Sequence, residues 1–199
     1  MILSKKSIEA QMKYGNIVID PFYPEQLGPN SYDLHLGKTL IELRLPETDS
    51  DYSGEAWFLD VKRDIAADYH NVEINKETGG FLLLPGTLYL GVTAEYTESR
   101  AHVPIMEGKS SLGRMGIESH VCAGMGDVGF CGYWTLEIRV TVPTILYPGM
   151  PIGQIVWHTV DGMVDTDYKE TGSYNNLKVE NPKPGIPNLW KKLNQFISI

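Results

Sequence analysis

The sequence contains little cysteine and no long apolar segment. Only two cysteines, Cys122 and Cys131, occur in 199 residues, and neither belongs to a CxxC pair. This cysteine content predicts neither a disulfide framework nor a structural zinc site. No apolar window of roughly 18 residues occurs, and the N-terminal MILSKKSIEA lacks the apolar core of a signal peptide. We therefore expect reduced thiols in a cytoplasmic protein that does not contact a membrane.

Positive charge and metal-binding patterns are also scarce. Lys and Arg number 17 against 25 Asp and Glu, giving a net charge of -8, which argues against a nucleic-acid partner. The five histidines show neither HExxH nor HxE spacing, so the signatures of zinc hydrolases and zinc deaminases are missing. We predict no metal ligands, and we expect His120 to be a buried, hydrogen-bonded residue.

The patterns that are present predict a mainly β domain over residues 1–199. Apolar and polar residues alternate in TLYLGVTAE, and Pro-Gly turns at 85–86 and 148–149 each precede such a segment. Repeated units of turn and strand favour a sandwich or a barrel. Ser4 is placed to cap a short helix over about 5–14 that stops at Gly15. Residues 161–199 are predicted to form a flexible tail or lid and, after Pro187, an amphipathic C-terminal helix.

Residues 107–137 combine cations, hydroxyl groups, glycines and two carboxylates. The phrase GKSS at 108–111 is not a phosphate-binding P-loop, because that motif needs a glycine where this sequence has Val103. Ser110, Ser111 and Arg114 can still bind phosphate oxygens from a glycine-rich turn, with Lys109 adding charge.

The two carboxylates in this stretch each allow two interpretations. In YWTLEIRVTV, Leu136 and Ile138 share one strand face and Glu137 lies on the other. Glu137 is then either part of a solvated face or a general base in a polar cleft. Asp127, between glycines, either closes a turn or accepts a sugar hydroxyl or orients water beside a bound nucleotide.

Several longer motifs occur together and in order. They are IDPFYPEQLGPNSYDLHLG (19–37), LLPGTLYLGVTAE (83–95), EGKSSLGRMG (107–116), HVCAGMGDVGF (120–130) with TLEI (135–138), and LYPGMPIGQI (146–155). With these motifs the chain resembles the dCTP deaminases, which form one superfamily with the trimeric dUTPases. The resemblance implies a distorted, jelly-roll-like β-barrel of the dUTPase type with short peripheral helices, assembled as a homotrimer whose active sites are shared between subunits.

The resemblance also implies roles for individual residues. Glu137 would activate the water that attacks C4 of cytosine, Ser111 and Arg114 would hold and polarise the reacting groups, and Asp127 would contact the deoxyribose. The implied substrate-binding set is Lys109, Ser110, Ser111, Leu112, Gly113, Arg114, Val121, Cys122, Ala123, Asp127, Thr135, Leu136, Glu137, Tyr168 and Tyr174. Mg²⁺ would accompany the triphosphate, as a hard cation does on phosphate oxygens.

The sequence departs from the family pattern in three places. Cys122 stands where a Thr is common, and Ala123-Gly124 resembles the bifunctional members more than the Ala-His of some members that only deaminate. In the tail, Gly172-Ser173-Tyr174 lacks the usual phosphate-contacting lysine, for which Lys169 or Lys178 could substitute.

The leading hypothesis is zinc-independent deamination of dCTP to dUTP and ammonia, with Glu137 as general base. The alternatives are a bifunctional enzyme that converts dCTP to dUMP and diphosphate, or a dUTPase. A lesser alternative is a non-catalytic trimer that binds nucleotides. The expected partners are dCTP, dUTP, dTTP as an inhibitor, and further copies of the chain.

Overall fold

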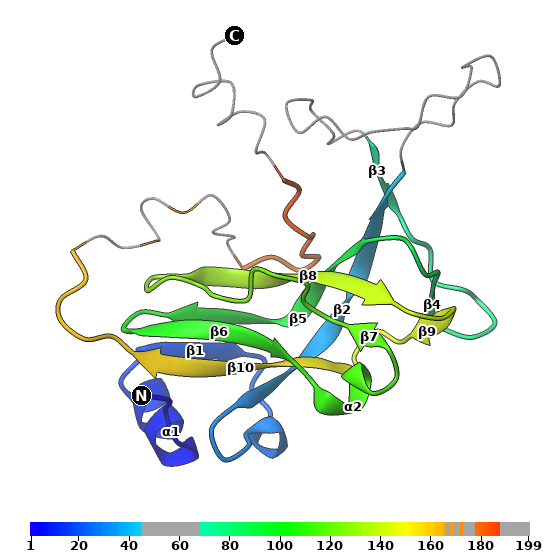
Figure 1. The fold of residues 1–199 in the computed structure, drawn as a ribbon. Helices are drawn as coiled ribbons and strands as arrows, with labels where there is room; N and C mark the ends of the chain where they lie inside the picture. The colour runs from blue at the N-terminus through cyan, green and yellow to red at the C-terminus, as the bar shows by residue number, and fades with distance from the viewer. Residues whose placement is uncertain (45–67, 166–167, 169–171, 173–177, 188–199) are drawn as a thin grey trace, which may run out of the picture.

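The protein folds around antiparallel β-strands, as the computed structural model shows (Figure 1). The structure describes residues 1–44, 68–165, 168, 172 and 178–187. The elements are α1 (Lys5–Lys13), β1 (Ile17–Asp20), the 3-10 turn η1 (Pro24–Gln26), β2 (Tyr32–Leu43), β3 (Tyr69–Asn71), β4 (Phe81–Leu83), β5 (Tyr89–Ser99), β6 (His102–Gly108), α2 (Ser110–Gly113), β7 (Ile117–Glu118), β8 (Cys131–Val140), β9 (Thr144–Leu146) and β10 (Pro151–Thr159). The expectation of a mainly β fold with short peripheral helices is confirmed.

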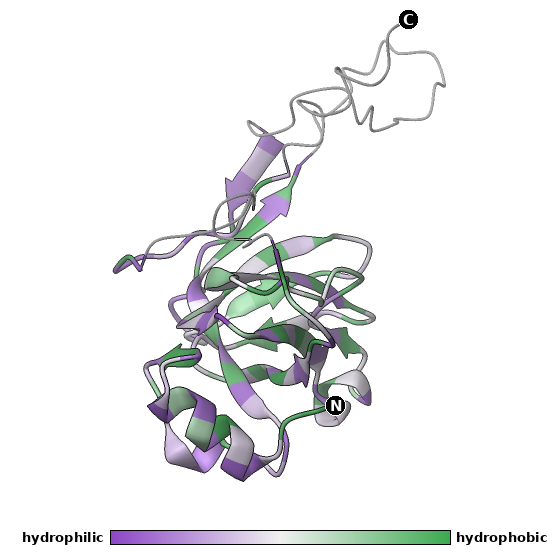
Figure 2. Ribbon diagram, turned by 90° about the vertical axis from the view of Figure 1, so that its left-hand side faces the viewer, coloured by the Kyte–Doolittle hydropathy of each residue, from purple (hydrophilic) through white to green (hydrophobic). Residues whose placement is uncertain are grey.

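One eight-stranded sheet carries most of the fold. Its strand order is β6-β10-β2-β5-β8-β7, with β1 paired to β5 and β3 to β2, while β4 and β9 form a separate pair. The main sheet curls into a nearly closed barrel, and α1 packs outside it beside β1 and β10 (Figure 1). β3 and the adjoining end of β2 project from the body as a ribbon, in both views (Figures 1 and 2).

The core is made by the inward faces of these strands. Tyr32, Leu34 and Leu36 of β2 alternate with polar positions and are fully buried, and Ile155 and Trp157 of β10 do the same. Figure 2 shows this alternation of apolar and polar residues along the ribbon. Because alternate residues of a strand point to opposite faces, the polar positions of the same strands can line clefts.

The N-terminal helix follows its sequence signals closely. The Ser4 hydroxyl accepts a hydrogen bond from the Ser7 N–H at 3.3 Å, and the chain leaves the helix through Gly15 at φ 74°. Leu3 and Ile8 are both buried in the main core cluster, so the helix is anchored at its start. The predicted boundaries of 5–14 differ from α1 by one residue.

The Pro-Gly turns are also where the sequence places them, with Gly86 at φ 85° before β5 and Gly149 at φ 82° before β10. No helix among the described residues is both long enough and apolar enough to cross a membrane. The predicted helix after Pro187 lies outside the described residues, as do Lys169 and Tyr174.

Candidate active site

Strand β8 presents Glu137 to a cavity. Along this strand Trp134, Leu136 and Ile138 are buried, while Thr135 and Glu137 lie on the other face and are only partly buried. Thr135 and Glu137 line a cavity of about 350 Å³, which Trp134 of the buried face also reaches. The cleft interpretation of Glu137 is therefore the one that the structure supports, and the solvated-face interpretation is not.

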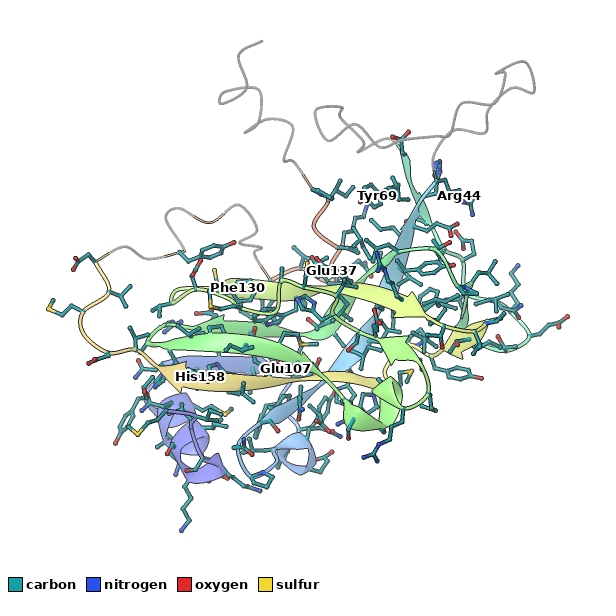
Figure 3. The ribbon with its side chains drawn as sticks, viewed as in Figure 1. Arg44, Tyr69, Glu107, Phe130, Glu137 and His158 are labelled. Atoms are coloured by element: carbon teal, nitrogen blue, oxygen red, sulfur yellow. The ribbon has the colours of Figure 1, made fainter. Side chains whose placement is uncertain are left out.

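The walls of this cavity combine acidic and aromatic side chains. Asp127 and Glu137 both line it, together with the rings of Phe130, Trp134 and Tyr168. Phe130 and Trp134 pack with ring centroids 4.6 Å apart. Figure 3 shows Glu137 and Phe130 at the β8 layer, on the side of the sheet away from α1. An apolar wall with a few polar groups is typical of a small-molecule site.

A loop before β8 holds the Glu137 carboxylate in place. The backbone N–H of Cys122 donates to Glu137 Oε2 at 3.2 Å, and the Cys122 thiol donates to the same oxygen at 3.7 Å. The negative charge of Glu137 raises the pKa of the Cys122 thiol, so the thiol stays protonated and can donate. Both bonds go to Oε2, and no described residue hydrogen-bonds to Oε1, so Oε1 can receive a proton from another molecule.

Two glycines let this loop approach the barrel closely. The Met106 N–H donates to the Gly124 carbonyl at 2.7 Å, and the Gly126 N–H donates to the Pro104 carbonyl at 2.8 Å. A Cβ on Gly124 would overlap the Met106 carbonyl oxygen, and one on Gly126 would lie 2.9 Å from the Trp134 ring. The close approach brings Ala123 and Asp127 into the cavity wall.

His120 lies in the same cavity wall and differs from its prediction. The residue is partly buried, and both ring nitrogens are buried with no hydrogen-bond partner among the described residues. The expectation of a hydrogen-bonded histidine is therefore wrong. The sequence contains no motif around His120 that could have indicated a place in the site.

The predicted phosphate-binding residues Lys109, Ser110, Ser111 and Arg114 lie outside the cavity. Together with Asp33 and Gln154, which the structure places beside them, they form a separate group that we call the α2 cluster. Lys109 Nζ lies 2.5 Å from Asp33 Oδ2, and Gln154 Nε2 donates to the Gly108 carbonyl at 3.3 Å. Ser110, Ser111 and Arg114 are exposed. None of the α2 cluster lines the described cavity of its own chain.

The remaining predicted site residues have mixed positions. Leu112 and Leu136 are buried in the core, whereas Val121, Gly113 and Cys122 are exposed. Thr135 lines the cavity, and its hydroxyl accepts a hydrogen bond from the Gly185 N–H at 2.8 Å.

Parts of the C-terminal segment lie beside β8. The Tyr133 hydroxyl donates to the Val179 carbonyl at 2.9 Å, and the Tyr168 N–H donates to the Val128 carbonyl at 3.0 Å. Lys178 forms an ion pair with Asp20 at the end of β1, not with the α2 cluster. Asp33 and Gln154, which sequence reasoning missed, join Lys109 because β2, β6 and β10 are neighbours in the sheet.

Comparison with a solved structure agrees with the fold. A crystal structure of 2'-deoxycytidine 5'-triphosphate deaminase from Agrobacterium tumefaciens superposes with a TM-score of 0.59 at 22% sequence identity. The match covers 82% of this chain and 49% of that one. At this identity the likeness shows the fold, a dUTPase-type barrel with strands as its main elements.

Sequence comparison shows the family. Residues 2–160 match the family described as dCTP deaminase-like. A protein named "dCTP deaminase, dUMP-forming" from Cytophaga hutchinsonii is 45% identical over 179 residues, covering 89% of this chain and 92% of that protein. A protein of the same name from Clostridium botulinum strain Eklund 17B is 43% identical over 176 residues, covering 88% and 91%. The chain belongs to the dCTP deaminase-like family.

Proposed function

We propose that the protein is a dCTP deaminase of the dUMP-forming type, which converts dCTP to dUMP with release of ammonia and diphosphate. The names of relatives above 40% identity support this reading. They favour the bifunctional alternative over the leading hypothesis, in which the product is dUTP. The observation that carries the proposal is the position of Asp127 and Glu137 in the wall of one cavity, with one oxygen of Glu137 held by Cys122.

In the first reaction, Glu137 acts as base and then as acid. Water bound at Oε1 gives a proton to the carboxylate as its oxygen attacks C4 of cytosine, and Glu137 passes that proton to ring N3. The second proton of the attacking oxygen then moves to the amino nitrogen. The C4–N bond breaks, ammonia departs, and a 4-oxo pyrimidine remains.

In the second reaction, Asp127 orients the attacking water. Water attacks the α-phosphorus of the deaminated nucleotide, Asp127 accepts its proton, and the bond to the bridging oxygen breaks. Diphosphate leaves and dUMP remains. Asp127 is exposed at the cavity wall, so it can reach both solvent and a bound nucleotide.

The triphosphate is held by a second copy of the chain in a homotrimer. This part of the proposal is supported by the separation of the α2 cluster from the cavity of its own chain. Lys109, Ser110, Ser111 and Arg114 of one subunit supply cations and donors to phosphate oxygens at the next subunit's cavity. Mg²⁺ arrives on the triphosphate, because it prefers phosphate oxygens and few protein ligands. Within the α2 cluster, Lys109 forms an ion pair with the carboxylate of Asp33.

The Glu137→Gln variant tests the proposed chemistry. The amide cannot accept the proton of water, so ammonia release from dCTP should fall by at least about a thousandfold, while the affinity for dCTP stays within about threefold. Cleavage of dUTP to dUMP should persist, because Asp127 remains. Near-normal ammonia release in this variant would contradict the role of Glu137.

A further inference from the structure

The two-stranded sheet of β4 and β9 has apolar side chains on both of its faces. The inward face, with Phe81, Leu83 and Leu146, belongs to the main core cluster. The outward face carries four apolar side chains with exposed fractions of 37–49%, which we call the β4–β9 patch: Leu82, Leu84, Ile145 and Tyr147. A sheet with one face in solvent usually alternates apolar and polar residues, so this second apolar face needs a physical reason.

The side chains of the β4–β9 patch form one continuous surface. Leu82 and Ile145 are directly opposite each other in the pairing of the two strands. A Cβ on Gly80 would lie 2.5 Å from Cγ2 of Ile145 and 3.1 Å from Cδ1 of Tyr147, so these two side chains lie together over Gly80. No described residue covers the patch, since each of its side chains is more than a third exposed. A contiguous apolar surface of this kind marks a contact site.

The C-terminal segment has an apolar surface of matching size. Residues 188–199 lie outside the described residues, and their sequence places five apolar residues at helical spacing: Leu189, Trp190, Leu193, Phe196 and Ile197. The positions between them are polar, with Lys191, Lys192, Asn194 and Gln195. A helix over this segment would be about 18 Å long, which is enough to cover a sheet of two short strands.

The described chain ends close to the patch. Gly185 and Pro187 line the cavity that holds Glu137, and so does Leu90 of β5. Leu90 follows Tyr89, whose hydroxyl accepts a hydrogen bond from the Leu84 N–H at 2.8 Å. One tyrosine side chain therefore separates the cavity wall from the patch. β4 and β9 lie at the end of the barrel where β8 ends (Figure 1).

We propose that residues 188–199 form an amphipathic helix that docks its apolar face on the β4–β9 patch of the same chain. Docking removes apolar surface of both partners from water. It also anchors the chain just beyond Gly185, whose N–H donates to the Thr135 hydroxyl in the cavity wall. The apolar outward face of β4 and β9 is then part of the core between this sheet and the C-terminal helix.

Trp190 makes the docking measurable in the full chain. Its fluorescence is the difference between the spectra of the unmodified protein and of the Trp190→Phe variant. Leu82→Asp should increase the quenching of Trp190 by acrylamide at least about twofold, because docking would bury an unpaired charge. Ile145→Thr is a milder change of the patch and should act in the same direction. Met163→Asp is the control, since Met163 is exposed outside the patch.

Thermal melting provides a second measurement. Leu193→Ser should lower the melting temperature by about 2–6 °C in the unmodified chain and by less than about 1 °C in Leu82→Asp, where the contact is already lost. Gln195→Ser, outside the apolar stripe, should change neither.

Equal quenching of Trp190 in the unmodified chain and in both patch variants would overturn the inference. A fall in the mass of the assembly in those variants, measured by sedimentation, would also overturn it, because that result assigns the patch to a contact between copies.

Discussion

Cys122 and Glu137 meet at a single carboxylate oxygen, Oε2, through the Cys122 N–H at 3.2 Å and its thiol at 3.7 Å. This contact joins the loop before β8 to the strand that carries the proposed base. It orients the carboxylate while leaving Oε1 for water. It also explains how a cysteine can stand where the family commonly has Thr, because both side chains offer a donor to the carboxylate.

The alkylation rate of the Cys122 thiol should depend on the charge of Glu137. In a Cys131→Ser background, Cys122 is the remaining thiol, and its alkylation rate follows the fraction of thiolate. The Glu137 charge raises the pKa of Cys122, so Glu137→Gln should lower that pKa and speed alkylation at a given pH. Alkylation rates measured between pH 7 and pH 10 should shift to lower pH in the variant. Superimposable profiles would contradict the contact.

Gly124 should tolerate no side chain. Gly124→Ala would place a Cβ against the Met106 carbonyl oxygen, so the loop must move and Cys122 must leave Glu137. We expect ammonia release to fall at least about tenfold, with a loss of about 1–3 kcal/mol in unfolding free energy. Gly113→Ala is the control for stability, because nothing lies within 4 Å of a Cβ there. Equal unfolding free energies in the two variants would show that the loop is more adaptable than its contacts indicate.

Leu136 should contribute to stability by packing in the core, and its side chain should not contact the substrate. Its side chain is fully buried between Thr135 and Glu137, which face the cavity. Leu136→Ala should lower the free energy of unfolding by about 2–5 kcal/mol, measured by urea titration. Val142→Ala, at an exposed position just beyond β8, should cost less than about 0.5 kcal/mol. A small effect at Leu136 would contradict the burial of its side chain in the core.

Glu95 should make stability depend on pH. Burial raises the pKa of its carboxyl, and bonds from the His35 N–H at 2.9 Å and the His35 ring only partly oppose this. The folded protein then holds this proton more tightly than the unfolded chain does. The stabilisation that the Glu95 carboxyl contributes is therefore present at low pH. It is lost as pH rises from about 4.5 through the pKa of Glu95 in the folded protein.

Glu95→Gln removes this titration while keeping the shape of the side chain. As pH rises through this window, the unfolding free energy of the unmodified protein should fall relative to that of the variant. Urea titrations at successive pH values provide the measurement. Two parallel stability profiles would show that Glu95 has the same pKa in both states.

Local sequence patterns predicted the structural features that depend on adjacent residues. The alternation around Glu137, the cap at Ser4 and the turn at Gly149 are each determined by a few adjacent residues, and the structure confirms them. The sheet order is a different matter, because it depends on pairings between distant segments. The ion pair between Lys109 and Asp33 exists only because β2 and β6 both flank β10.

The candidate site shows the same division. Asp127 and Glu137 stood out as carboxylates in a glycine-rich stretch, but the contact between Cys122 and Glu137 depends on how the loop folds back onto β8. The unpaired ring of His120 could not be predicted, since hydrogen-bond satisfaction is a property of the packed structure.

The most direct test of the account is the product formed from dCTP. The protein is incubated with dCTP and Mg²⁺, and nucleotides, ammonia and diphosphate are quantified over time. We predict that dUMP, ammonia and diphosphate appear in equal amounts. Accumulation of dUTP without diphosphate would contradict the dUMP-forming reaction.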